Sequence, residues 1–159
     1  MEFVQSQYDK YDKLGRKLLV EFLVNHGWTV VPKEEEDYLI DIVASKDGKT
    51  EHFEVEMKRT EFTSEEDFPF PTVSFLERKK KFHKDHYFFY VIISSINYGA
   101  LIIRSDKIYN KIYSEVLDIN TKERSGVDYF YRVPKKFCTF ISPEKFLINK
   151  EYAQDTDHI

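Results

Sequence analysis

The order of the elements that the sequence predicts indicates an α/β protein built on a mixed β-sheet. An amphipathic helix comes first, a β-hairpin follows it, and a near-continuous apolar run over 86–95 is typical of a strand buried on both faces. The chain has 159 residues, which suits a single domain with a sizeable core. We therefore expect one domain over residues 1–150 and a flexible tail over residues 151–159.

The first helix is predicted over residues 11–28. Apolar side chains recur there at the period of a helix: Leu14, Leu18, Leu19, Phe22 and Leu23. Gly27 is a suitable residue to end the helix because it adopts the left-handed conformation without a steric penalty. A short strand should follow over 28–31, before Pro32.

The hairpin is predicted from two strand-like segments, 38–45 and 50–60, joined by the tight turn "KDGK" at 46–49. We expect Asp41 in the interior of the first strand, between two isoleucines. Glu56 lies on the second strand.

The second half of the chain continues the mixture of helices and strands. We expect strands at 72–75, 86–95, 98–105, 127–133 and 137–141, and helices at 76–84, 106–116 and 142–150. Asp106 is a candidate cap of the second of these helices. Ser142 and Pro143 have the residue types of the start of the third.

Composition excludes several classes of protein. Cys138 is the single cysteine, so the chain forms no internal disulfide and no four-cysteine zinc site, and we expect it to be a core residue. A reducing, cytoplasmic location fits this usage. The start of the chain lacks the apolar segment of a signal peptide, and no run reaches the roughly 18 apolar residues of a membrane helix, so we expect no membrane association.

The net charge of −4 argues against a protein that coats nucleic acid through bulk charge. The charges are clustered, however. Acidic residues gather at 33–37 and 61–67, and basic residues gather at 77–84 and 132–136. A localised basic surface therefore remains compatible with the composition.

The stretch "FEVEMKRT" at 53–60 carries the chemistry of the sequence. Glu54, Glu56 and Lys58 alternate with apolar residues and share one face of the strand. A hairpin in register would bring Asp41 toward this row. Two carboxylates placed together repel, so one pKa rises unless a cation lies between them, and hard oxygen ligands with open positions suit Mg²⁺. The pattern indicates metal-assisted hydrolysis of a phosphodiester, although a solvated face of cross-strand charge pairs is the simpler alternative.

These residues, with the preceding helix and the following basic segment and buried strand, resemble the core of the PD-(D/E)XK nuclease superfamily over roughly residues 14–103. The layout is most similar to small Holliday-junction resolvases and phage nucleases. The resemblance implies a restriction-endonuclease-like mixed sheet flanked by helices. It also implies a deoxyribonuclease that uses Mg²⁺, with Mn²⁺ as a substitute.

The resemblance also implies roles for individual residues. Asp41 and Glu56 would bind the metal with the backbone carbonyl of Val55, and Lys58 would orient or activate water. Glu21, on the first helix, would add a ligand or an outer hydrogen bond, or be a solvated helix charge. Glu54 is the alternative to Glu56 if the strand is shifted, and Glu56 is preferred because it alone lies two residues before a lysine.

Basic residues outside the hairpin are candidates for nucleic-acid contacts. Several nucleases of this group place a basic residue from the segment after the Glu-x-Lys strand near the metal or the scissile phosphate. The candidates for phosphate contacts are Arg78, Lys79, Lys80, Arg132, Lys135 and Lys136. A run of lysines is also what a solvated helix face looks like.

Two classes of function remain open from the sequence. The first is a Mg²⁺-dependent endonuclease that acts on DNA, with branched or otherwise structured DNA among the candidate substrates, or else on RNA. The second is a catalytically inactive module of the same fold that binds nucleic acid or a protein partner. Many small nucleases of this type act as homodimers, so that two sites meet two strands.

Overall fold

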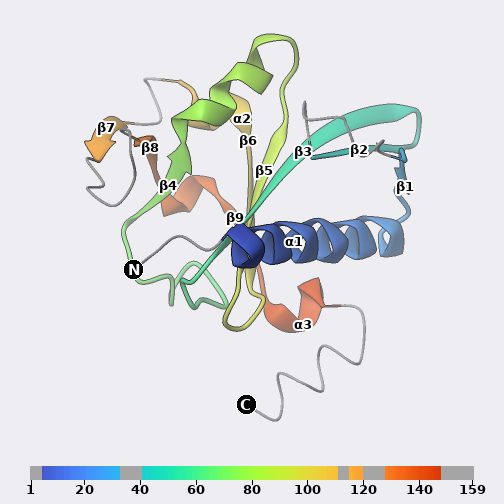
Figure 1. Ribbon diagram of the computed structural model, residues 1–159, viewed down its shortest axis with the longest axis horizontal. Coiled ribbons are helices and arrows are strands. Elements are labelled where there is room, and N and C mark those ends of the chain that lie inside the picture. Colours follow the sequence, from blue (N-terminus) through green and yellow to red (C-terminus); the bar gives the residue numbers. More distant parts are fainter. Residues whose placement is uncertain (1–4, 33–40, 111–114, 120–127, 148–159) are drawn as a thin grey trace.

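The computed structural model describes residues 5–32, 41–110, 115–119 and 128–147 (Figure 1). Two β-sheets and a long N-terminal helix form an α/β fold. The elements, in chain order, are α1 (Gln5–Asn25), β1 (Thr29–Val30), β2 (Ile42–Lys46), β3 (Lys49–Lys58), β4 (Thr72–Leu76), the 3-10 helix η1 (Glu77–Lys84), β5 (Phe89–Ser94), β6 (Ala100–Arg104), α2 (Ser105–Ile108), β7 (Glu115–Ile119), β8 (Asp128–Pro134), the 3-10 helix η2 (Lys135–Phe137), β9 (Thr139–Ile141) and α3 (Pro143–Phe146).

The larger sheet has six strands in the order β1-β2-β3-β5-β6-β9. β3 and β5 run parallel, and the other neighbouring strands run antiparallel. The sheet is therefore mixed, as the sequence predicts. The parallel pair requires a crossover, and the chain between its two strands forms β4 and η1.

One face of the larger sheet packs against α1. Phe53 and Val55 of β3 and Val91 and Ile93 of β5 point to this face, where they meet the apolar stripe of the helix. The stripe includes Leu18, Leu19 and Leu23, which are all buried. The period of 3.6 in the helix and of 2 in the strands explains why the two surfaces match.

The opposite face of the larger sheet packs against a second, three-stranded sheet in the order β4-β8-β7. Tyr90 and Ile92 of β5 point to this side and contact Val73 and Phe75 of β4 and Val133 of β8 within one buried cluster. β5 therefore contributes side chains to two cores, which accounts for its near-continuous apolar sequence. Cys138 belongs to this second core and is buried, as expected.

The hairpin of β2 and β3 turns at Asp47 and Gly48, whose φ angles are 51° and 78°. Two successive residues with positive φ are characteristic of a type I′ turn, so the tight turn predicted at 46–49 is confirmed. The turn pairs Lys46 with Lys49 and Ile42 with Phe53. The first helix, the buried strand β5 and the short helix after Ser142 are likewise confirmed.

Three expectations differ from the structure. Asp41 precedes β2 instead of lying inside it, because β2 begins at Ile42. Of the helix predicted over 106–116, the described residues form α2 only as far as Ile108, and Glu115 begins β7. Arg104 occupies the N-cap position of α2 where Asp106 was expected. At α3 the expectation is confirmed, since Ser142 occupies the N-cap position and Pro143 the start of the helix, although Ser142 makes no side-chain capping hydrogen bond.

Some expectations fall, in whole or in part, outside the described residues. These are the acidic cluster at 33–37, the start of the first hairpin strand at 38–40, residues 111–114 of the helix expected over 106–116, the start of the strand expected over 127–133, the end of the last helix at 148–150 and the tail at 151–159. Within the described residues, no helix is long and apolar enough to cross a membrane.

Candidate functional site

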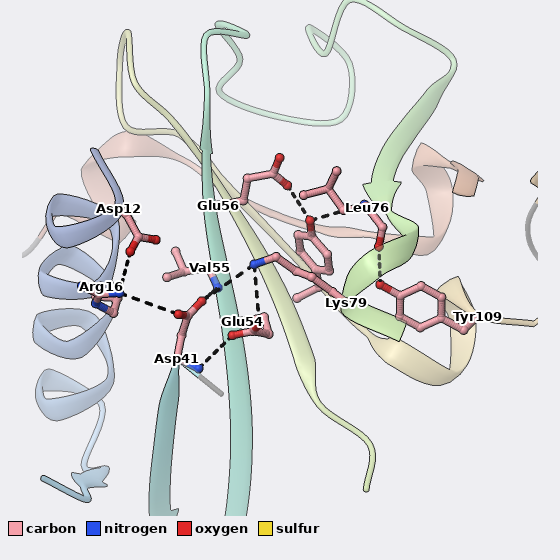
Figure 2. Close-up of polar contacts among 10 residues, drawn as sticks. Asp12, Arg16, Asp41, Glu54, Val55, Glu56, Leu76, Lys79 and Tyr109 are labelled. Carbon is pink, nitrogen blue, oxygen red and sulfur yellow. Dashed lines mark hydrogen bonds and ion pairs between the residues drawn. The ribbon is translucent and has the colours of Figure 1, made fainter. Parts of the chain in front are cut away.

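The register of the hairpin brings Asp41 together with Glu54. Because Ile42 pairs with Phe53, the next position outward on each strand carries an acid. The backbone N–H of Asp41 donates to Oε2 of Glu54 over 2.8 Å, and the backbone N–H of Val55 donates to Oδ2 of Asp41 over 3.1 Å. Each carboxylate therefore binds the backbone of the other strand and holds the open end of the hairpin (Figure 2).

Glu56 lies two residues farther along the same face of β3 and belongs to a different network. Its Oε2 accepts a hydrogen bond of 2.5 Å from the hydroxyl of Tyr90, and that hydroxyl lies 3.5 Å from the backbone N–H of Leu76. Figure 2 shows the Glu56 carboxylate on the Leu76 side of β3, away from Asp41. The preference for Glu56 as the acid facing Asp41 is therefore wrong, and the alternative, Glu54, takes that position.

Lys79 of η1 supplies the cation between the two acids. Its Nζ lies 3.6 Å from Oε1 of Glu54 and 3.8 Å from Oδ2 of Asp41 (Figure 2). Nζ of Lys79 also lies over the ring of Tyr90, 5.3 Å from the ring centroid. The lysine is thus held by packing and by charge at once.

The first helix reaches the site through Arg16 and Asp12. Nη1 of Arg16 lies 2.6 Å from Oδ2 of Asp12, one turn earlier, and 3.8 Å from Oδ1 of Asp41. Glu21 was the residue expected to contribute from this helix. It lies five residues after Arg16, which rotates it by more than a third of a turn from the face that Arg16 and Asp12 share. The structure therefore does not place Glu21 beside these acids.

Glu54 is an unusual acid because it is buried, with 3% of its surface exposed. Burial disfavours the charged carboxylate and raises the pKa of Glu54 to about 8, the ammonium of Lys79 opposes the rise, and the nearby Asp41 adds to it. The expectation that one of two neighbouring carboxylates titrates upward therefore applies to Glu54.

Lys58 points to a third location on the same strand. Its Nζ donates to the backbone carbonyl of Ser74 on β4 over 2.5 Å. It thus links the larger sheet to the smaller one. The lysine next to the two acids is Lys79, which comes from η1.

The remaining basic candidates are spread over the surface. Arg78 and Lys80 are exposed on η1, with Nζ of Lys80 5.7 Å from the centroid of the Tyr131 ring. Arg132 is exposed on β8. Lys135 donates from Nζ to the carbonyl of Phe68 over 3.2 Å, and Lys136 is exposed with its Nζ 5.3 Å from the ring of Phe137.

The donor set at Asp41 and Glu54 suits Mg²⁺, which proteins bind through one or two carboxylates while waters and substrate phosphates complete the shell. The N–H of Val55 points to the Asp41 side of β3, and the carbonyl of a strand residue points the same way as its N–H, so Val55 adds a backbone oxygen there. Within the described residues, no group of three or more acidic, histidine or cysteine side chains could hold a metal. The two acids and this carbonyl are therefore the candidate ligands.

Sequence reasoning underrated Glu54 and missed the contribution of Arg16 and Asp12. The signal for Glu54 was present in the turn. With a two-residue turn at Asp47 and Gly48, five steps outward along each strand lead from Lys46 to Asp41 and from Lys49 to Glu54. The signal for Arg16 was weaker, because helical periodicity shows which residues are buried and not what the flanking charges contact.

No protein-family model matches the chain, and no curated protein is similar to it in sequence.

Proposed function

We propose that the protein is a Mg²⁺-dependent endonuclease that hydrolyses phosphodiester bonds in DNA, on a fold of the restriction-endonuclease type. The observation that carries the proposal is the position of the Lys79 ammonium, 3.6 Å and 3.8 Å from the carboxylates of Glu54 and Asp41. Two acids on a hairpin beside one lysine offer what phosphodiester hydrolysis needs, namely ligands for a cation and a donor for a charged oxygen. The order of α1, hairpin, η1 and β5 supports a relation to the PD-(D/E)XK superfamily.

The residues would divide the work as follows. Oxygens of Asp41 and Glu54, with the carbonyl of Val55, would hold the cation. A bound Mg²⁺ would supply Lewis-acid stabilisation of the phosphate and lower the pKa of a bound water. Lys79 would donate to a non-bridging oxygen of the phosphate or hold the attacking water, the role first expected of Lys58.

The state of Glu54 couples this site to pH. Because its pKa is about 8 without a metal, Glu54 retains its proton over much of the neutral range. A ligand carboxylate must be charged, so cation binding would release this proton. Apparent affinity for Mg²⁺ should therefore rise with pH toward 8.

A cleavage assay with Mg²⁺ or Mn²⁺ on supercoiled, linear, single-stranded, flapped and four-way-junction DNA, with an RNA strand included, tests the proposal. Asp41→Asn, Glu54→Gln and Lys79→Met should each lower the cleavage rate on the order of 100-fold, because the first two remove a charged ligand of the cation and the third removes the donor to the phosphate oxygen. Glu51→Gln is the matched control, since Glu51 lies on the same strand and contacts none of the three residues of the site in the described structure.

Two results would contradict the proposal. One is cleavage by Glu54→Gln at the rate of the Glu51→Gln control. The other is the absence of metal-dependent cleavage of every substrate, together with calorimetric titrations of Mn²⁺ that do not differ between wild type and Asp41→Asn. The second result would favour the inactive binding module, in which Lys79 and Arg16 simply neutralise the acids.

A further inference from the structure

A pocket of about 330 Å³ lies farther along the face of β3 that carries Glu54. Lys58 and Thr60 form one side of the pocket, β4 and the preceding segment from Phe68 to Pro71 form another, and Arg132 of β8 closes it. A volume of this size is at the lower end of those that hold small ligands. None of the roles in the proposed reaction uses this pocket.

The charges of the pocket have one sign. Its charged lining residues are Lys58 and Arg132, both cationic, in a protein whose net charge is −4. Arg132 is exposed and forms no ion pair with another residue in the part of the chain that the structure describes. Lys58 uses one of its three N–H donors on the carbonyl of Ser74. The pocket therefore presents free donors to an anion.

The pocket also has an aromatic wall. Phe70 is 55% exposed, which is high for a phenylalanine, and its ring packs edge-on against the buried Phe68, with 6.1 Å between the ring centroids. The ring is thus supported from behind while its surface stays open. A supported, open aromatic ring beside cations is the arrangement that binds an unstacked nucleobase next to its phosphate.

The wall that carries Phe70 is fixed to the rest of the fold. Nζ of Lys135 donates to the carbonyl of Phe68, and its backbone N–H donates to the carbonyl of Pro71, each over 3.2 Å. Ser74 pairs with Arg132 across β4 and β8. The pocket is therefore formed in the free protein, which reduces the entropy cost of binding.

The location relates the pocket to the candidate site. Lys58 lies four residues beyond Glu54 on the same face of β3, a separation of roughly 13 Å along the strand. A few nucleotides of a single strand cover such a distance. A strand with one phosphate at Asp41 and Glu54 could thus reach the pocket with a nucleotide a few positions away.

We propose that this pocket binds one nucleotide of a DNA strand, with the base on Phe70 and the phosphate between Lys58 and Arg132. The inference rests on the proposed function, since it assigns the pocket to a flanking nucleotide of that substrate. Binding of this nucleotide would help to select the DNA strand and to set the position of the cut along it.

Strand binding measured without cleavage tests the proposal. A short fluorescein-labelled oligothymidine is titrated with protein in EDTA, and fluorescence anisotropy gives the dissociation constant at several salt concentrations. Phe70→Leu should weaken binding about fivefold or more, because it removes the stacking surface while keeping apolar bulk. Arg132→Gln should weaken binding and reduce the slope of log K against log salt by about 0.7, the share of one phosphate contact on a single strand.

Matched controls separate the pocket from general effects of charge and aromatic content. Tyr11→Leu removes an exposed ring on α1, and Arg104→Gln removes an exposed cation at the end of β6. Both should bind the oligonucleotide as wild type does. An abasic strand should remove the effect of Phe70→Leu and keep that of Arg132→Gln, and thermal melting confirms that each variant is folded.

Several results would overturn the assignment. These are wild-type binding by both pocket variants, losses as large in the controls, or equal sensitivity of normal and abasic strands to Phe70→Leu. Tighter binding of free thymidine monophosphate than of the oligonucleotide would also overturn it. The assay is independent of catalysis: if wild type cuts DNA but the pocket variants bind and cut normally, the pocket assignment fails alone. If the pocket variants lose binding but wild type cuts nothing, the proposed function fails and the nucleotide site stands.

Discussion

At the scale of single residues, burial of the Glu54 carboxylate costs desolvation free energy that its contacts only partly offset. A buried carboxylate is stabilised here by one backbone N–H and by Lys79, yet burial still dominates and raises the pKa to about 8. Buried acids with shifted pKa values are more frequent at functional sites than elsewhere, which is consistent with the proposed role. Glu56, two residues on, is instead held by Tyr90.

The pKa of Glu54 predicts how stability depends on pH. In the unfolded chain the pKa is near 4.5, so between pH 4.5 and pH 8 the folded protein keeps a proton that the unfolded chain has lost. Stability falls with rising pH wherever the folded state binds more protons. The free energy of unfolding should therefore decrease across this range by up to about 1.4 kcal/mol per pH unit relative to Glu54→Gln, which has no such proton.

Urea denaturation in EDTA, at a series of pH values, measures the difference between the two proteins. The difference in free energy of unfolding between wild type and Glu54→Gln should change between pH 4.5 and pH 8 and become constant above about pH 8. Parallel curves for wild type and Glu54→Gln would show that Glu54 has an ordinary pKa in the folded protein.

At the scale of elements, two turns place the strands that carry the site. The turn at Asp47 and Gly48 sets the register of the hairpin, and no atom lies within 4 Å of the position of a Cβ at Gly48. The turn before β6 packs against the chain that follows β3, so that a Cβ on Gly99 would overlap the carbonyl oxygen of Phe62. The first turn thus depends on backbone conformation and the second on close packing.

The two glycines should respond differently to substitution. Gly99→Ala should lower the free energy of unfolding by roughly 1–3 kcal/mol, because the new methyl group forces backbone atoms apart. Gly48→Ala should cost about 1–2 kcal/mol, from its φ angle of 78° alone. Because the expected losses of stability overlap, a second substitution at each glycine is needed to distinguish steric overlap from backbone strain.

Replacement by asparagine, measured by urea denaturation, is that second substitution. Asparagine adopts positive φ more readily than alanine, so Gly48→Asn should be better tolerated than Gly48→Ala. Gly99→Asn should be at least as harmful as Gly99→Ala, because its larger side chain meets the same carbonyl. The same order at both positions would contradict the distinction between the two turns.

At the scale of the whole molecule, the larger sheet joins two cores. Successive residues of β5 alternate between them, so that Ile93 packs with the core under α1 and Ile92 with the core under the smaller sheet. The site lies at this junction, since it combines a residue of α1, two acids of the hairpin and a lysine of η1. Its geometry therefore depends on both cores being formed.

Cooperative unfolding of the two cores is the corresponding prediction. Ile92→Val and Ile93→Val should each lower stability by about 0.5–1.5 kcal/mol, the usual effect of removing one buried methyl group. Trp28, the single tryptophan, contacts Phe53 in the core under α1, and far-UV circular dichroism reports on the whole fold. Both probes should shift together for both variants in urea denaturation. A shift in circular dichroism with Ile92→Val that leaves the Trp28 transition unchanged would show that the two cores unfold separately.

Much of the fold could be predicted because its causes are local. The stripe of Leu18, Leu19 and Leu23, the turn chemistry of Asp47 and Gly48, and the apolar run of β5 each identify an element within a short window. The helix expected over 106–116 shows the limit of such local patterns. Apolar spacing at Ile108 and Ile112 is compatible with a helix, but the chain ends α2 at Ile108 and forms β7 from Glu115.

Periodicity and turn type act over a few residues, so the amino-acid sequence is enough to predict the mixed α/β class, the hairpin and the acids that the hairpin presents. Which of these acids lie together depends on the packing of distant elements. Tyr90, 34 residues beyond Glu56, donates a hydrogen bond to that acid. Lys79 of η1 lies beside Asp41 and Glu54, whereas Lys58 donates to the carbonyl of Ser74. Such contacts join residues far apart in the chain, and they depend on how sheets and helices pack together, which no local pattern specifies.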